Sequence, residues 1–325
     1  IAIVGVGAVF MMKGKTTVGD FSASLLMVST LLAAIRTMVE FSEQFNRGMT
    51  GIERFTEIMD EVSDIKDSPD AKPISGVKGD IEFKNVTFSY KGTDKKILSD
   101  FSLHIAPGEN VALVGPSGGG KTTLCNLIPR FYDASSGTIR VDGRNVNSYS
   151  LEELREKVHV VLQRAVLFRG TLRENLLWGN KNANDEEMQA AVKAAQAADF
   201  VQSKGGLDMK ITAEGRNLSG GQRQRLSIAR ALVGNPEILI LDDSASALDY
   251  VTEKALRGAL SALPNKPTVF IVSQRTSSLR HADKILVLDN GALVGCGTHD
   301  ALLENCSVYR EIYDSQFGGK EAAAK

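Results

Sequence analysis

Hydrophobic and polar residues are distributed differently in the N-terminal part of the chain and in the rest, and the N-terminal part is strongly apolar. Residues 1–12 are apolar without interruption, residues 21–35 carry no charge, and the polar turn 13–17 separates the two stretches. We interpret 1–12 as the end of one membrane helix and about 18–39 as another. The charge-free part of the second is short for a span of about 20 residues, which leaves a buried core helix as the alternative. A signal peptide is a poor explanation, because no basic segment precedes the apolar one.

The helical period continues beyond this apolar front. Between Phe41 and Val62 apolar residues recur at steps of three and four, and polar residues such as Glu43 and Arg47 occupy the other face. This pattern predicts an amphipathic helix that continues the membrane helix into water. Prolines and glycines then gather in residues 63–79, which predicts a linker.

From Asp80 onward the pattern becomes that of strands and helices in alternation. Residues 81–88 alternate like a half-buried strand. Buried strands separated by helices predict an α/β domain around a parallel sheet, and we place it at 80–318. Residues 319–325 end in a sequence that matches engineered rigid linkers, so we leave them out of the functional interpretation. The other predicted strands are 111–114, 238–241, 269–272 and 285–288, and the predicted helices are 151–157, 185–203 and 222–233.

Composition narrows the classes of function. The formal net charge is −1, whereas a protein that binds nucleic acid usually shows a basic surplus, so we expect no nucleic-acid partner. The three cysteines lie far apart, without the spacing of a disulfide framework or a zinc site.

A glycine-rich segment follows the predicted strand 111–114. It fits the pattern G-x-x-x-x-G-K-[ST] and stands between a predicted strand and a predicted helix, the context in which such a loop binds phosphate. Glycines let backbone N–H groups turn toward phosphates. Lys121 would reach the β- and γ-phosphates, and the Thr122 hydroxyl would bind Mg²⁺. The candidate ATP-binding residues here are Gly115, Ser117, Gly118, Gly119, Gly120, Lys121, Thr122 and Thr123.

A carboxylate completes this prediction. Asp242 ends the apolar run 238–241, and a carboxylate in that place can hold Mg²⁺ through water. The sequence therefore predicts a site for ATP and Mg²⁺.

Residues 218–222, Leu-Ser-Gly-Gly-Gln, followed by Arg-Gln-Arg, resemble the signature motif of ATP-binding-cassette (ABC) proteins. The resemblance covers residues 80–316 and implies a mixed sheet with a helical subdomain that carries the signature. It implies that Tyr90 stacks on adenine, that Gln163 contacts the metal and the γ-phosphate, and that 246–249 form the D-loop. Taken singly, Tyr90 could be a strand-end aromatic residue, Gln163 a solvated turn residue and Asp249 a helix N-cap.

Members of this family pair two nucleotide-binding domains head to tail, so that each ATP lies between two chains. The resemblance therefore implies that this chain's signature contacts the nucleotide of a second half-transporter. Residues 1–62 resemble the last membrane helices of an exporter. We expect the chain to be the C-terminal part of a multi-pass protein of the cell membrane, with its lipid-facing segment in the bilayer and the nucleotide-binding domain in the cytoplasm. The signature residues expected at the partner's nucleotide are Ser219, Gly220, Gly221 and Gln222.

Two positions depart from the family pattern. Asp243 stands where the family has a glutamate that polarises the attacking water, and Gln274 stands where it has a histidine. None of the four histidines falls at that place. We treat Asp243, Gln274 and Gln163 as the catalytic candidates, with Thr122, Gln163 and Asp242 as metal ligands.

Both departures weaken the same catalytic step. They predict that this chain retains ATP with little turnover and completes a competent site on a different partner chain, which supplies the glutamate and the histidine. A slow homodimer is the alternative. A soluble ABC-type ATPase outside transport is another, which the apolar front of the chain disfavours.

Overall fold

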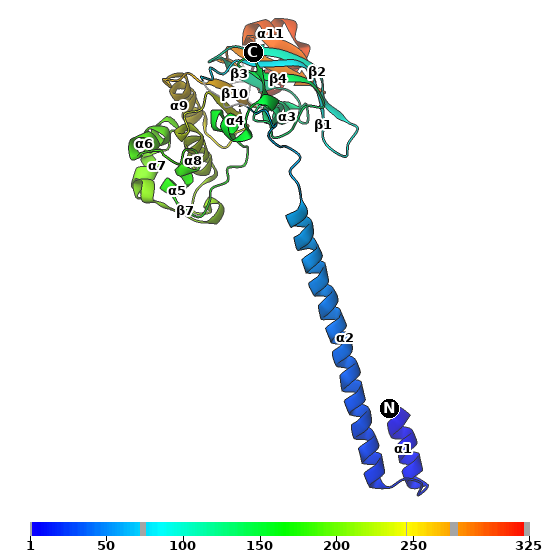
Figure 1. Ribbon diagram of the computed structural model, residues 1–325. Coiled ribbons are helices and arrows are strands. Elements are labelled where there is room, and N and C mark those ends of the chain that lie inside the picture. The colour runs from blue at the N-terminus through cyan, green and yellow to red at the C-terminus, as the bar shows by residue number, and fades with distance from the viewer. Residues whose placement is uncertain (1, 72–75, 245, 274–278, 322–325) are drawn as a thin grey trace. The chain divides into compact units, whose positions relative to one another are not determined.

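The computed structural model describes residues 2–71, 76–244, 246–273 and 279–321, and the chain divides into two units, Ile1–Asp64 and Ile65–Lys325. The first unit is a helical hairpin of α1 (Ala2–Met12) and α2 (Val18–Asp60). Figure 1 shows α1 beside the first turns of α2.

Local chemistry sets the hairpin turn. Thr17 caps α2 in a reciprocal capping box, because its hydroxyl accepts from the backbone N–H of Asp20 and the Asp20 carboxylate accepts from the Thr17 N–H. The two helices approach closely where Gly7 faces Phe21. A Cβ at Gly7 would lie 2.2 Å from the ring of Phe21, so glycine is what lets the helices pack here.

A single long helix covers both the predicted membrane segment and the predicted amphipathic helix. α2 has 43 residues, which corresponds to about 65 Å at 1.5 Å per residue, and none of them is buried. Gly48 and Gly51 do not interrupt it, and it ends at Asp60. Among the described residues, α2 is the helix long and apolar enough to cross a membrane by length and composition.

The second unit is built on two larger sheets and one small one. The six-stranded sheet has the order β12-β11-β3-β10-β9-β6; β12 is antiparallel to β11 and the other pairs are parallel. The antiparallel four-stranded sheet has the order β2-β1-β4-β5. The strands are β1 (Ile81–Ser89), β2 (Lys96–Ile105), β3 (Asn110–Val114), β4 (Ser136–Val141), β5 (Arg144–Asn145), β6 (Val158–Val161), β7 (Gly170–Thr171), β8 (Lys210–Ile211), β9 (Ile238–Asp242), β10 (Thr268–Val272), β11 (Lys284–Asp289) and β12 (Ala292–Gly297).

Helices surround these sheets, and α5 to α8 gather in a separate helical part that Figure 1 shows beside the strands. This arrangement confirms the predicted α/β class with a mixed sheet and a helical signature subdomain, preceded by a long apolar helix. The helices are α3 (Lys121–Leu127), α4 (Leu151–Lys157), α5 (Leu172–Leu177), α6 (Asp185–Ala194), α7 (Ala198–Ser203), α8 (Gly220–Val233), α9 (Tyr250–Ser261), α11 (His299–Asn305) and α12 (Ser307–Glu321), with short 3-10 turns at Val146–Ser148, Gly206–Asp208 and Ala213–Gly215.

The single helix predicted over 185–203 is wrong. Gln196 has a positive φ of 58° and separates α6 from α7. The guanidinium of Arg225 in α8 donates to the Gln196 carbonyl at 2.7 Å and lies 4.8 Å from the ring centroid of Phe200. A tertiary contact therefore fixes a break where helical propensity alone continues.

Part of the predicted linker is anchored to the second unit. The carboxylate of Asp142 accepts hydrogen bonds from the backbone N–H groups of Lys78, Gly79 and Asp80 at 2.9, 3.4 and 3.1 Å. The carboxylate of Asp67 accepts from the N–H of Leu151, the first residue of α4, at 2.8 Å. These contacts fix the chain where it enters β1.

The Asn175 side chain hydrogen-bonds to the backbone at the start of the helical part. Its loss is expected to destabilise that part strongly. Its side chain is 1% exposed; it accepts from the Phe168 N–H and donates to the carbonyls of Phe168 and Thr171. We expect Asn175→Ala to lower the free energy of unfolding by about 3 kcal/mol, because three hydrogen bonds are lost and buried polar groups lose their partners.

Urea unfolding followed by the fluorescence of Trp178, the chain's one tryptophan, measures this. Asn182→Ala is the matched control, since Asn182 is exposed and the change is expected to shift stability by no more than about 0.5 kcal/mol. Equal stability of both variants would contradict the role assigned to Asn175.

Candidate functional site

Three neighbouring parallel strands end together at one edge of the six-stranded sheet. β3, β10 and β9 lie side by side in parallel, so the chain after Val114, Val272 and Asp242 emerges at the same edge. This is the edge at which ligands bind in open α/β sheets. A cavity of about 340 Å³ lies here. It is lined by Tyr90, Ile97, Ser117, Gly118, Gly119, Gly120, Lys121, Thr122, Thr123, Gln163, Asp242, Asp243 and Val272.

The glycine-rich loop needs its glycines at particular positions. Gly115 has a φ of 151°, and a Cβ there would lie 1.9 Å from the Leu288 carbonyl oxygen. Gly118 and Gly120 have φ values of 78° and 96°, which favour glycine. The loop can therefore turn tightly after β3 and deliver the next residue, Lys121, into the cavity.

The Lys121 ammonium group lies over the loop. Its Nζ donates to the carbonyls of Gly115 at 2.9 Å and Pro116 at 2.8 Å, and the residue is 9% exposed. Burial lowers the pKa of Lys121, while the carboxylates of Asp242 and Asp243 act in the opposite direction. A partly desolvated cation of this kind favours an anionic ligand such as a phosphate.

Oxygen ligands suited to a hard cation meet beside this lysine. The Thr122 hydroxyl donates to Asp242 Oδ1 at 3.1 Å, and Asp242 is 6% exposed. Burial raises the pKa of Asp242, and the hydrogen bond from Thr122 opposes that shift. A hydroxyl and one carboxylate fit Mg²⁺, which is usually bound by one or two carboxylates together with waters and substrate phosphates. Within the described part of the chain, no group of three or more His, Cys, Asp or Glu side chains could hold a metal alone.

Asp243 and Gln163 form a direct contact across the cavity. Gln163 Nε2 donates to Asp243 Oδ2 at 2.9 Å, and the backbone N–H of Asp243 donates to the Val272 carbonyl at 3.0 Å. Asp243 is half-buried and has a positive φ of 46°. The strand ends of β9 and β10 therefore hold the Asp243 backbone, and a neutral amide engages its carboxylate.

Tyr90 belongs to an aromatic cluster at the cavity. Its hydroxyl lies 2.9 Å from Thr123 Oγ1, and its ring packs edge-on against Phe88 and Tyr132 at centroid distances of 4.9 and 5.2 Å. Tyr132 is 41% exposed and was not predicted from the sequence. Its signal is weak, since it lies in the turn after α3 and no motif marks it.

The signature residues lie apart from this cavity. Ser219 caps α8, because its Oγ accepts from the Gln222 N–H at 3.2 Å while Gln222 Oε1 accepts from the Ser219 N–H at 3.1 Å. Ser219, Gly220, Gly221 and Gln222 are absent from the residues that line the cavity. Ser219 and Gly220 are exposed, and no atom lies within 4 Å of a Cβ built at Gly220. The start of α8 is therefore open to a ligand from outside this chain.

A residue not predicted from the sequence connects the signature helix to the cavity. Gln224, on α8 and 2% exposed, donates from Nε2 to the Leu162 carbonyl at 3.2 Å. Leu162 immediately precedes Gln163, so one buried amide couples the two candidate regions.

The predicted D-loop leads into a helix. Asp249 is the N-cap of α9 and accepts from the Thr252 N–H at 2.9 Å, which confirms the N-cap interpretation. The Ser246 hydroxyl donates to the Asp243 carbonyl at 2.8 Å. Gln274, the remaining catalytic candidate, lies outside the described residues.

Comparisons with known proteins agree with this geometry. Residues 98–246 match the protein-family model described as ABC transporter. The chain is similar to "Uncharacterized ABC transporter ATP-binding protein YwjA" of Bacillus subtilis (strain 168), with 42% identity over 313 residues, 96% of this chain and 54% of the relative. It is also similar to "Putative multidrug export ATP-binding/permease protein YgaD" of the same strain, with 39% identity over 317 residues, 97% of this chain and 55% of the relative.

The chain is also similar to a solved structure of an ABC exporter. The chain resembles a bacterial Atm1-family ABC exporter with ATP bound, with a TM-score of 0.77 and 34% identity, over 93% of this chain and 53% of the exporter. The chain thus spans about half the length of the curated relatives it matches.

Proposed function

Because the chain belongs to the ABC transporter family, we propose that it binds Mg-ATP beside its glycine-rich loop and serves as the ATP-driven part of a paired membrane exporter. The observation that carries the proposal is the convergence of Lys121, Thr122 and Asp242 in one cavity at the carboxyl edge of β3 and β9. A buried cation, a hydroxyl and a carboxylate in this arrangement suit a nucleoside triphosphate with its metal ion.

Each group has a role in this proposal. Lys121 gives up its carbonyl contacts in the loop to reach the β- and γ-phosphates, while loop N–H groups bind the phosphate oxygens. Thr122 and Asp242 would hold Mg²⁺, which neutralises phosphate charge when bound, and Gln163 would approach the same ion. Tyr90 provides the aromatic face for adenine.

The same residues support a site with little hydrolysis. Aspartate is one methylene shorter than glutamate, which sets the Asp243 carboxylate back by about 1–1.5 Å, and a misplacement of about 1 Å can cost roughly 100-fold in rate. The Asp243 carboxylate also accepts from Gln163. Gln274 carries an amide, which cannot become a cation. This chain would then retain ATP, and its signature would complete a competent site on a different half-transporter.

The first unit supports a membrane location. Apolar side chains of α2 such as Leu26, Leu31 and Ile35 are 68%, 62% and 56% exposed, and α2 is long enough to span a bilayer. Lipid and further helices of the same transporter would cover them. We place residues 1–62 in a multi-pass membrane domain, 63–79 in a linker and 80–318 in a cytoplasmic nucleotide-binding domain, with 319–325 outside the functional chain.

Tyr90 tests the ATP proposal by substitution. Tyr90→Ala is expected to weaken ATP binding about tenfold, because stacking between an aromatic ring and a base contributes about 1–3 kcal/mol. Equilibrium binding of a fluorescent ATP analogue to the whole chain measures it. Tyr90→Phe is the control, since it keeps the ring and loses only the hydroxyl contact with Thr123. Unchanged affinity in Tyr90→Ala would refute the assigned adenine contact.

A further inference from the structure

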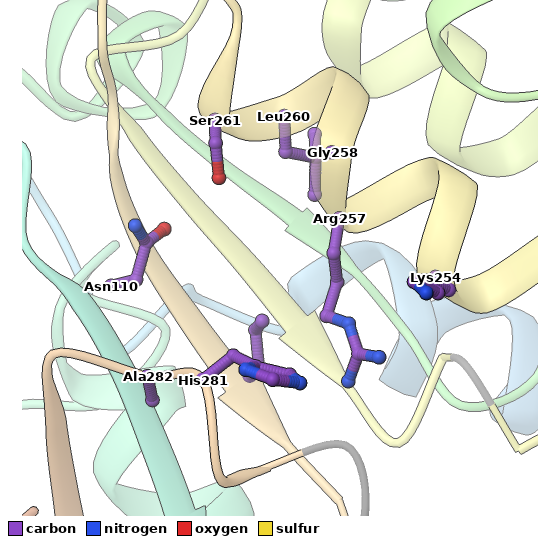
Figure 2. Close-up of a pocket in the computed structure, with 9 residues that line it drawn as sticks. Asn110, Lys254, Arg257, Gly258, Leu260, Ser261, His281 and Ala282 are labelled. Atoms are coloured by element: carbon purple, nitrogen blue, oxygen red, sulfur yellow. The ribbon is translucent and has the colours of Figure 1, made fainter.

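A second cavity lies on the second unit, separate from the nucleotide cavity. It has a volume of about 300 Å³ and shares no lining residue with the first. Residues of α9 from Lys254 to Ser261 form one wall. Ile271 of β10 contributes from the central sheet, and His281 and Ala282 lie just before β11. Figure 2 shows these side chains around the opening. Pockets for small molecules begin at about this size.

Among the residues that the structure describes, the titratable side chains that line this cavity are basic. They are Lys254, Arg257 and His281, with no aspartate or glutamate among them. Figure 2 shows the side chains of Arg257 and His281 pointing toward one another. Arg257 is held in place by an ion pair with Glu253, which is buried, at 3.3 Å. A fixed guanidinium beside two further basic groups is a suitable place for a carboxylate, sulfonate or phosphate group.

Two of these basic side chains lack a protein partner. In the described part of the chain, the side chains of Lys254 and His281 make no hydrogen bond or ion pair, and both residues are exposed. Arg257 has the Glu253 carboxylate as its counterion, whereas the Lys254 ammonium has none among the described residues, and a bound anion would supply one. An acidic ligand would therefore neutralise positive charge at the cavity that the described protein groups leave uncompensated.

The rest of the cavity lining is apolar or uncharged. Leu260, Ile271 and Ala282 contribute apolar surface, and Asn110 and Ser261 contribute an amide and a hydroxyl. Figure 2 places Ser261 and Asn110 away from the basic side chains. Asn110 is oriented by Asp283, whose carboxylate accepts from both its backbone N–H at 2.9 Å and its side-chain amide at 3.3 Å. A ligand here can place an acidic head at the basic end and an apolar body over Ile271.

We propose that this cavity binds a small amphipathic organic anion, with its acidic group against Arg257, Lys254 and His281 and its apolar body over Leu260 and Ile271. An occupant would contact two elements that reach the nucleotide site. α9 follows the D-loop directly through its N-cap Asp249, and β10 ends at Val272, which lines the nucleotide cavity. The cavity is thus a second binding site, with a ligand class distinct from Mg-ATP.

Binding of 2-naphthoate to the whole chain in nanodiscs tests this, with saturating Mg-ADP present so that the glycine-rich loop is occupied. Calorimetry is expected to show one 2-naphthoate per chain. The matched cation 2-naphthylmethylamine is expected to bind at least about tenfold more weakly, because Lys254 and Arg257 attract an anion and repel an ammonium group. This comparison needs no variant.

A double variant locates the site. Lys254→Ala with His281→Ala is expected to weaken 2-naphthoate binding at least about tenfold, and both positions are exposed, so the fold is expected to persist. Lys193→Ala, an exposed lysine on α6, is the control and is expected to leave the affinity unchanged. No saturable binding, equal binding of the cation, or full affinity in the double variant would each overturn the proposal.

Discussion

Lys121→Met is expected to weaken ATP binding by this chain about 100-fold. The ammonium lies at the floor of the nucleotide cavity, 9% exposed, and the phosphates would replace the loop carbonyls as its partners. A hydrogen bond to a charged group contributes about 1.5–3 kcal/mol, and 2.7 kcal/mol corresponds to about 100-fold. Methionine keeps the length and apolar volume of the stem, so the change removes mainly the charge. Equilibrium binding of Mg-ATP to the whole chain measures it.

Lys181→Met is the matched control for this substitution. Lys181 is an exposed lysine between α5 and α6, outside the cavity, and its loss is expected to leave ATP affinity unchanged. An ATP affinity within about twofold of the wild type in Lys121→Met, with Lys181→Met also unchanged, would show that the glycine-rich loop does not bind the triphosphate as assigned.

Gly220→Glu is expected to reduce ATP turnover by the assembled transporter at least about 100-fold, a loss of the size caused by removing one essential oxyanion donor. Gly220 is the first residue of α8, and a Cβ there meets no atom within 4 Å, so this chain can accept the side chain. In the paired arrangement, the new carboxylate would face the γ-phosphate of the partner's nucleotide. The new carboxylate and the γ-phosphate would repel each other, which would prevent the two chains from closing around the nucleotide as hydrolysis requires.

Measuring ATP affinity and ATP turnover separately distinguishes this effect from misfolding. Gly220→Glu is expected to keep the ATP affinity of this chain's own cavity, because Gly220 does not line it. Gln189→Glu adds a carboxyl group at an exposed position on α6 and is expected to leave turnover unchanged. Wild-type turnover in Gly220→Glu would argue against a signature that acts across a chain interface.

The convergence of Lys121 and Asp242 at one cavity could be predicted from the sequence, because each residue is tied to a local pattern. Lys121 follows a buried strand and a run of glycines, and Asp242 ends a fully buried one; parallel pairing then brings both to one edge. The glycines are required by backbone geometry, as the 1.9 Å approach at Gly115 shows. Such constraints act on single residues, so they can be recognised in the amino-acid sequence.

Contacts between distant segments could not be predicted in this way. The break at Gln196 depends on Arg225 of α8, and Gln224 of the same helix reaches the carbonyl of Leu162, which follows β6. β2 was missed because Asp100, with a φ of 49°, lies where the pairing with β1 shifts register and the alternation of buried and exposed residues is lost. β4 is short and begins with two exposed residues. The basic cavity beside α9 likewise joins residues from β3, α9, β10 and the segment before β11.

Steady-state ATP hydrolysis by the full-length, co-purified transporter, wild type against Asp243→Asn, tests the central claim most directly. Asparagine keeps the size of the side chain and an oxygen that can accept from Gln163, so binding is expected to persist. We predict that the variant keeps its turnover within about twofold, because in the proposed pairing hydrolysis would take place at the partner's site. A fall of about 100-fold, the contribution expected of a working general base, would instead show that Asp243 activates the water and that the transporter is a slow, symmetric enzyme.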